Sequence, residues 1–207
     1  MSGYVMGIDS SLTRTGITVL TQDRNGVARP KVLKDCGYSL PDTAGFDESA
    51  DRIVSQARTV ARVLDKFPPA LVLIEAMIPP KNALPSYLER GALWYSLWYE
   101  FRARNIPRAL IQPTTLKAWA TGYGRAEKED ILGEVSKWWP AIPVANHDIA
   151  DSAVCAAMCA MRLGWKLPFE TRRRHIEGVV TVRWPDELAP FTLRPAPVER
   201  RRKAGIR

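Results

Sequence analysis

The sequence is poor in the residues that build disulfide frameworks and zinc sites. Its 207 residues include three cysteines, at positions 36, 155 and 159, and two histidines. A sparse, odd set of cysteines is typical of reduced thiols in a cytoplasmic protein. So few histidines leave little with which to complete a zinc site. We therefore expect buried thiols, a cytoplasmic location and no disulfide scaffold.

Long hydrophobic runs are also missing. No apolar stretch approaches the ~20 residues that a membrane-spanning helix requires. The first residues lack the basic segment followed by an apolar one that marks a signal peptide. With 46% hydrophobic residues, the chain still has enough apolar material for the core of one domain. These features favour a protein that does not enter a membrane.

Acidic residues are outnumbered, and the excess of positive charge is uneven. The formal net charge is +8, and residues 1–166 contain 20 Lys and Arg against 17 Asp and Glu. Residues 167–207 contain 10 against 5 and are interrupted by prolines. We expect a folded domain over 1–166 and a basic Pro/Arg-rich extension over 167–207, which contains a short strand at 179–182. The extension would add charge to a nucleic-acid interface, or else be a solvated tail.

The hydrophobic pattern predicts an α/β protein with five strands. The first three strands would form an antiparallel meander, because a turn signal separates the second from the third. The expected strands cover residues 4–9, 17–20, 32–38, 70–75 and 109–111. The expected helices cover residues 47–67, 85–104 and 113–119, followed by one that ends near 139 and one from about 146 to 161.

Two of these strands end in carboxylates. The apolar runs 4–9 and 70–75 finish with Asp9 and Glu75. Ligands bind at this rim of open α/β sheets. A carboxylate buried without a partner costs several kcal/mol, roughly, so Asp9 needs one. Neighbouring strands would bring the two acids together, although Glu75 alone is equally consistent with a strand-end acid that faces solvent.

Two further acids lie at the start of the last helix. Asp148 and Asp151 are spaced i, i+3 and share one helix face beside His147. An N-cap role would explain one of them but not both. Oxygen ligands select hard cations such as Mg²⁺ or Mn²⁺, and two such ions roughly 4 Å apart assist phosphoryl displacement. The four acids predict a two-ion site, where His147 ligates metal, orients water or is an ordinary loop residue.

A basic, glycine-containing segment precedes the fourth expected helix. Gly122 and Gly124 lie just ahead of that helix, where free backbone N–H groups favour an anion. Arg125 and Lys128 strengthen this preference, as does Lys117 from the preceding helix. The segment therefore predicts a phosphate contact, with a plain loop as the alternative.

The order of these motifs resembles that of a known family. The motifs are GIDSSLTRTGI from residue 7, LVLIEAM from 71, PTTLKAWATGYGRAEK from 113 and HDIADSAVCAA from 147. Over about residues 4–163 they resemble the RuvC-type Holliday-junction resolvases. The resemblance implies a ribonuclease H-like fold, whose mixed five-stranded sheet carries helices on both faces. It also implies a metal-dependent homodimer that nicks two opposing strands of a four-way DNA junction, with the aromatic helix over 85–104 at the interface.

The resemblance assigns roles to the residues that match the family's motifs. Matching acids bind divalent metal, and matching lysines contact DNA and support catalysis. The implied catalytic residues are Asp9, Glu75, Asp148, Asp151, Lys117 and Lys128. His147 stays a candidate metal ligand from its position beside Asp148 and not from the resemblance. The expected DNA contacts are Lys81, Lys117, Gly122, Gly124, Arg125, Lys128, Arg172, Arg173 and Arg174.

The sequence departs from the family in three places. Asp9 is followed by two serines rather than by Pro-Gly. The segment 76–79 lacks the aromatic residue that bacterial members often carry after the strand-end Glu and that is thought to act at the junction centre. The basic extension is unlike the short bacterial ending. Such divergence suits a bacteriophage enzyme that acts in the host cytoplasm on four-way junctions and other branched DNA.

Other functions remain open on the sequence alone. Sugar kinases and actin-like ATPases share a related fold, but they need a second phosphate loop and a glycine-rich adenosine motif, which we do not find. A junction-binding protein without nuclease activity would not need four acids. A ribonuclease H-like nuclease that acts on RNA–DNA hybrids, or an exonuclease, would keep the chemistry and change the substrate.

Overall fold

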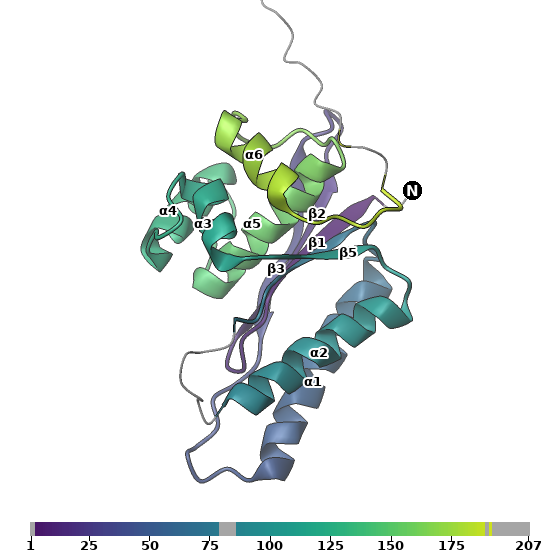
Figure 1. Cartoon of the computed structure of the whole chain (residues 1–207), viewed down its shortest axis with the longest axis vertical. Coiled ribbons are helices and arrows are strands. Elements are labelled where there is room, and N and C mark those ends of the chain that lie inside the picture. Colours follow the sequence, from purple (N-terminus) through teal and green to yellow (C-terminus); the bar gives the residue numbers. More distant parts are fainter. Residues whose placement is uncertain (1–2, 79–85, 189–190, 192–207) are drawn as a thin grey trace, which may run out of the picture.

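The centre of the molecule is a mixed five-stranded sheet with helices on both faces (Figure 1). A computed structural model describes residues 3–78, 86–188 and 191. The strand order is β3-β2-β1-β4-β5, with an antiparallel meander followed by two strands parallel to β1. The expected α/β class and sheet are thus confirmed. The strands are β1 (Tyr4–Asp9), β2 (Thr15–Gln22), β3 (Ala28–Cys36), β4 (Val72–Glu75) and β5 (Arg108–Ile111).

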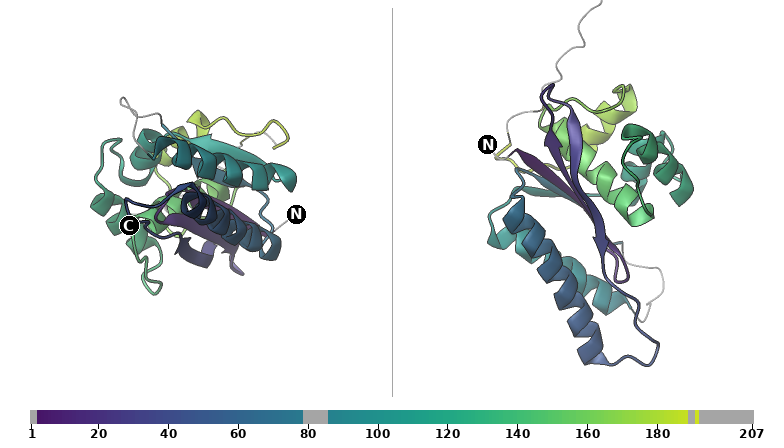
Figure 2. Two further views of the ribbon diagram at one scale, coloured as in Figure 1. Left: turned by 90° about the horizontal axis from the view of Figure 1, so that it is seen from below. Right: turned by 180° about the vertical axis from the view of Figure 1, so that it is seen from behind.

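The helices divide into two groups. One pair packs together on one face of the sheet, and the others gather on the opposite face around a central buried helix (Figure 2). The pair is α1 (Phe46–Lys66) and α2 (Tyr87–Ala103). The second group is α3 (Pro113–Thr121), α4 (Lys128–Trp138), α5 (His147–Arg162) and α6 (Arg173–Thr181). Among the residues that the structure describes, no helix has the length and apolar character needed to cross a membrane.

The alternation of side chains along β1 separates two hydrophobic cores. Met6 and Ile8 belong to the core beneath α1 and α2. Val5 belongs to the core on the α5 side. Since successive residues of a strand point to opposite faces, Gly7 and Asp9 share the α5 face with Val5. The strand therefore delivers its terminal carboxylate to the side that α5 covers.

Glycines let α5 approach the sheet closely. A Cβ at Gly7 would lie 2.0 Å from the carbonyl oxygen of Ser152, and a Cβ at Gly16 would lie 2.0 Å from the carbonyl oxygen of Asp148. A buried hydrogen bond of 2.8 Å joins the hydroxyls of Thr18 and Ser152 across the same interface. These contacts fix where α5 lies on the meander.

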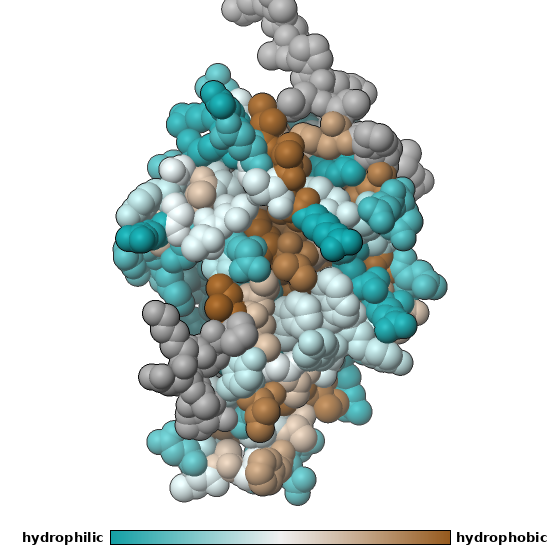
Figure 3. Space-filling view, in the orientation of Figure 1, coloured by the Kyte–Doolittle hydropathy of each residue, from teal (hydrophilic) through white to brown (hydrophobic). Residues whose placement is uncertain are grey.

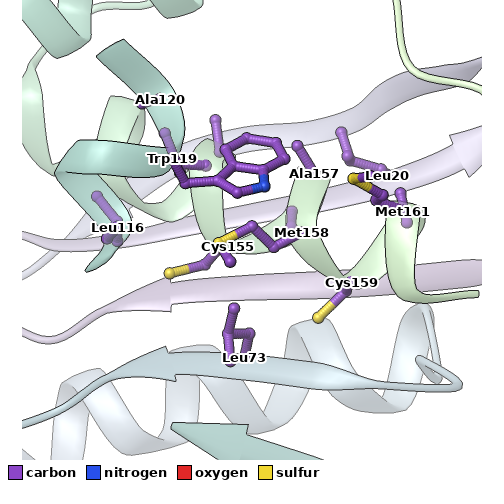
Figure 4. Packing of buried hydrophobic residues seen from close by; sticks show 14 of the residues in the cluster. Leu20, Leu73, Leu116, Trp119, Ala120, Cys155, Ala157, Met158, Cys159 and Met161 are labelled. Carbon is purple, nitrogen blue, oxygen red and sulfur yellow. The ribbon is translucent and has the colours of Figure 1, made fainter. Parts of the chain in front are cut away.

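The core on the α5 side is built around Trp119 of α3. Figure 4 shows its indole packed over α5 side chains that include Cys155 and Met158. Cys155 and Cys159 are buried free thiols, as the sequence predicted, and Cys36 is a half-buried free thiol.

The packed part of the chain continues past residue 166, where an extension was expected to begin. Residues 173–181 form α6, so the expected strand at 179–182 is wrong. His175 and Val179 are four residues apart and buried, which is the spacing of a helix face. The Trp119 Nε1 donates to the His175 carbonyl at 2.9 Å. Prolines flank this helix rather than interrupt it, and they concealed its pattern.

The third strand begins earlier than its hydrophobic run indicated. It was expected to start at residue 32, but β3 starts at Ala28 and includes Pro30 opposite Leu20. Proline is tolerated there because β3 is an edge strand and the register shifts between Val19 and Leu20. The difference does not affect the site, which lies on the central strands.

Candidate active site

Asp9 and Glu75 end neighbouring strands on the face covered by α5. β1 and β4 run parallel, with Ile8 opposite Ile74, so each acid is the next residue along. Leu73 belongs to the core on the α5 side, and Glu75 follows two residues later on the same face. The expectation that two distant segments bring these acids together is confirmed by this register.

The first two turns of α5 supply Asp148 and Asp151. The helix is capped by Asn146, whose Oδ1 accepts the Ile149 N–H at 3.0 Å. The Asn146 Nδ2 donates to Asp35 at 2.6 Å, which ties the cap to the end of β3. Neither aspartate is therefore the N-cap, and that alternative is wrong.

The carboxylates share a half-buried, mutually repulsive environment. Burial, followed by the charges of Glu75, Asp151 and Asp148, raises the pKa of Asp9 well above its ordinary value. Burial and then the Asp151 charge raise the pKa of Glu75 to about 7. Burial, together with the Asp148 charge, raises the pKa of Asp151 to about 6. Such crowding of acids is typical of a site that holds a cation or exchanges protons.

Two lysines lie beside these acids, as the sequence predicted. The positive charges of Lys117 and Lys128 lower the pKa values of Glu75 and Asp151, in opposition to burial. The Lys117 Nζ also donates to the Ala126 carbonyl at 2.8 Å, so it braces the segment between α3 and α4. Acids and lysines thus form one electrostatic unit.

The donor atoms of this unit suit a hard divalent cation. Asp151 Oδ1 is buried and has no hydrogen-bond partner in the described part of the chain. The four carboxylates offer oxygen alone, the ligand type that Mg²⁺ and Mn²⁺ favour. Within residues 3–78 and 86–188, no three Asp, Glu, His or Cys side chains already stand at the spacing that encloses an ion. The fit therefore rests on the donor type and the unpartnered oxygen.

His147 lies at the edge of the acid cluster. Its Nε2 is 3.7 Å from a carboxylate oxygen of Glu129 on α4, and its Nδ1 is buried without a hydrogen-bond partner among the described residues. Its contribution to metal binding stays a prediction.

Gly122 and Gly124 belong to the end of α3 and the turn after it, not to the start of α4. Gly122 ends α3 with φ 94°, and a Cβ at Gly124 would lie 3.1 Å from the Thr114 carbonyl oxygen. We expected free N–H groups at the start of α4. This expectation is wrong in part, because the Asp130 carboxylate accepts the Glu127 N–H at 3.0 Å. A phosphate contact here would depend on side chains, not on this helix end.

The remaining basic residues have different surroundings. Arg125 and Arg172 are exposed. Arg173 pairs with Glu177 at 2.5 Å. Arg174 donates to the carbonyls of Trp119 and Ala120, at 3.2 Å and 3.1 Å, and so stabilises the C-terminal end of α3. Their contacts with DNA stay predictions, and Lys81 lies outside the described residues.

Sequence reasoning missed one basic residue at the site. A small pocket holds Asp9 and Glu75 together with Met77 and Arg90, near the start of α2. The Arg90 charge also lowers the pKa of Glu75. The sequence could have pointed to Arg90 through its position, near the start of the helix that follows the strand-end acid Glu75.

Comparisons with known proteins agree on one family. Residues 5–160 match the family model described as crossover junction endodeoxyribonuclease RuvC. A protein of that description from Streptomyces griseus is 32% identical over 170 residues, 81% of this chain and 78% of that protein. One from Streptomyces coelicolor is 30% identical over 197 residues, 93% of this chain and 99% of that protein.

Solved structures share the fold. The Thermus thermophilus RuvC structure has a TM-score of 0.62 at 22% identity, over 80% of this chain and 99% of that chain. The structure of T. thermophilus RuvC in complex with Holliday junction substrate has a TM-score of 0.65 at 18% identity, over 88% of this chain and 99% of that chain. At these identities the likeness supports the architecture alone.

Proposed function

The chain belongs to the RuvC family of crossover junction endodeoxyribonucleases, and we propose that it resolves four-way DNA junctions by metal-dependent phosphodiester hydrolysis. One observation supports this most strongly. Four carboxylates from β1, β4 and α5 share one face of the sheet with two lysines. Acids that repel one another need cations, and a phosphodiester brings negative charge that cations and lysines neutralise.

Each group has a defined task in this proposal. Asp9, Glu75, Asp148 and Asp151 hold Mg²⁺ or Mn²⁺, as two ions. Such ions, when bound, lower the pKa of an attacking water and stabilise charge on the phosphate. Lys117 and Lys128 place positive charge beside the phosphate oxygens, where negative charge concentrates in the transition state.

The outer face of α2 supports a homodimer. Leu93 and Leu97 face the core, but Leu88, Tyr95 and Tyr99 are 81%, 67% and 66% exposed. The helix is thus not sandwiched, which leaves the interface as the alternative that its apolar sequence predicted. Figure 3 shows apolar side chains on the surface at the end of the molecule that α1 and α2 form. A second copy covering this face by twofold symmetry would give the assembly two equivalent sites, the number that cutting two opposing strands requires.

The alternative functions either use the same acids on another substrate or bind a junction without cutting it. A ribonuclease H-like enzyme for RNA–DNA hybrids, or an exonuclease, would use the same acids. A protein that binds junctions without cleavage has no use for four acids that repel DNA when metal is absent. We favour the junction because the sequence matches the family over 5–160. The expected cytoplasmic location and bacteriophage origin stay predictions.

A cleavage assay tests this function. Synthetic four-way junctions, linear duplexes and RNA–DNA hybrids are incubated with the protein and Mg²⁺, with chelator in parallel. We expect paired nicks in the junction with Mg²⁺, and we expect chelator to abolish them. Asp9→Asn should lose at least about a hundredfold in rate while it keeps junction binding. Asp51→Asn, an exposed acid on α1, is the matched control and should cut at the parent rate. Full activity of Asp9→Asn, or activity in chelator, would refute the metal assignment.

A further inference from the structure

A groove of about 620 Å³ adjoins the acid pocket. Its walls are the turn between β1 and β2, the segment before α1, and the first turns of α1 and α2. Ser10, Leu12 and Arg90 line both this groove and the small pocket that contains Asp9 and Glu75. The groove therefore leads directly to the acids.

One wall of the groove is held in place by buried hydrogen bonds. The Gln56 Nε2 on α1 donates to the Leu12 carbonyl at 2.7 Å, and the Thr15 hydroxyl donates to the Gln56 Oε1 at 2.6 Å. These bonds fasten the turn that carries Ser10 and Ser11 to α1. A wall fixed in this way loses little conformational entropy when a ligand binds.

The other wall is also fixed, and most of its charge is neutralised. Arg52 of α1 pairs with Glu89 of α2 at 2.5 Å, and the Ser49 hydroxyl donates to Glu89 at 2.9 Å. Asp42, on the segment before α1, is the other acid that lines the groove. The Arg90 side chain makes no hydrogen bond or ion pair with residues that the structure describes, so its charge is available where groove and pocket meet.

Arg90 also faces away from the exposed stripe of α2, which consists of Leu88, Tyr95 and Tyr99. It precedes the buried Leu93 and Leu97 by three and seven residues and so shares their side of the helix. Tyr95 and Tyr99 lie on the opposite side and are exposed. A second copy that covers the tyrosines would leave Arg90 and the groove accessible.

We propose that this groove receives the DNA strand next to the bond that is cleaved, and that Arg90 binds the phosphate adjacent to the scissile one. The assignment rests on the proposed nuclease function. A guanidinium matches a phosphate through two parallel hydrogen bonds. The hydroxyls of Ser10, Ser11 and Thr13, on the same wall, offer further donors of the kind that position DNA backbones.

The first test measures junction affinity against salt concentration in full-length protein that carries Asp9→Asn. Arg90→Gln should weaken binding about tenfold and lower the slope of log affinity against log salt by about one. Arg90→Lys should restore the slope. Arg24→Gln, an exposed arginine in the turn between β2 and β3, at the opposite end of these strands from Asp9, is the control and should change neither quantity. An unchanged slope in Arg90→Gln would overturn the proposal.

The second test locates the phosphate. Neutral methylphosphonates replace single phosphates on either side of the cleaved bond, and affinities are measured for the parent and for Arg90→Gln. At the contacted phosphate the two changes should be non-additive, because either one already removes the interaction. Additive losses at all positions would overturn the contact. A parent that binds but never cleaves would refute the nuclease function, while the salt slope would still decide whether the groove binds DNA.

Discussion

Gly16 of β2 lies directly against the backbone of Asp148, since a Cβ on Gly16 would be 2.0 Å from the Asp148 carbonyl oxygen. Gly16 is also the register partner of Asp9. One glycine thus lies between two acids of the site. It determines how closely the first turn of α5 approaches the end of β1.

Gly16→Ala should therefore displace α5 and impair cleavage. A displacement of about 1 Å at reacting groups costs about a hundredfold in rate, and overpacking costs about 1–3 kcal/mol of stability. Single-turnover cleavage and thermal unfolding measure the two effects. Gly133→Ala is the control, because no atom lies within 4 Å of its added Cβ, and in a helix interior it should be neutral or stabilising. Parent-like activity in Gly16→Ala would contradict this account of the site.

Asn146→Ala should destabilise the protein by about 1 kcal/mol and slow cleavage. The change removes the cap bond to Ile149 and the link to Asp35, which together hold the turn that carries Asp148 and Asp151. Ser86→Ala is the stability control, because Ser86 caps α2 without a side-chain hydrogen bond. If both variants unfold at the same temperature, Asn146 does not anchor the site.

The metal-free protein should lose stability as pH rises from about 4.5 to about 7. Glu75 has an ordinary pKa of 4.5 and a folded-state pKa of about 7. Within this window the folded protein binds more protons than the unfolded chain, so rising pH favours unfolding. Burial raises the pKa of Asp9 in the same direction. Divalent metal should oppose the decline because it favours the ionised acids.

Unfolding temperatures across pH 4.5 to 8, in chelator and in Mg²⁺, measure this effect. Glu75→Gln should flatten the decline in chelator, since it removes one titrating group. A decline of equal steepness in parent and variant would show that Glu75 is not its source.

Tyr99→Glu should prevent the proposed homodimer from forming and leave a monomer. The substitution places a charge in the exposed stripe of α2, where Tyr99 is 66% exposed in the single chain. Light scattering after size exclusion gives the mass, and a cruciform plasmid shows whether both strands are cut in one encounter. Val180→Glu, on α6 and 65% exposed, is the matched control and should remain dimeric. A dimeric Tyr99→Glu protein would assign the interface to another face.

Two truncations should behave differently. Deleting residues 192–207, which contain six Lys and Arg and one Glu, should weaken junction binding and reduce its salt dependence while the fold is kept. Deleting 167–207 also removes α6, whose His175 carbonyl binds Trp119 in the core, and should yield unstable protein. Circular dichroism and binding titrations at several salt concentrations distinguish the two cases. Equal stability of both truncations would show that α6 is dispensable.

The elements nearest the site were the most predictable from the sequence. β1 and β4 are short apolar runs that end in acids, and their pattern determines both the strand and the position of the carboxylate. The position of Asp148 and Asp151 on one helix face follows from their spacing. Their distance from Asp9 does not, because it depends on contacts such as that of Gly16 with α5, which join segments far apart in the chain.

The groove and α6 were not predictable for the same reason. Arg90 belongs to no motif, and it becomes part of the site through the packing of α2 beside β4, where the Trp94 Nε1 donates to the Glu75 carbonyl at 2.9 Å. Arg174 looked like part of a charged tail because arginines precede it. Its bonds to α3 depend on tertiary structure that its neighbours in sequence do not reveal.

The close fit of α5 against Gly7 and Gly16 has a consequence for synthesis. β1 leaves the ribosome before the helix that completes both its packing and its cluster of acids, since that helix ends at Arg162. Until that helix emerges, the nascent sheet exposes one apolar face, which is a natural target for chaperones. A nascent chain whose α5 has not yet left the ribosome therefore lacks two of the four acids of the site, Asp148 and Asp151.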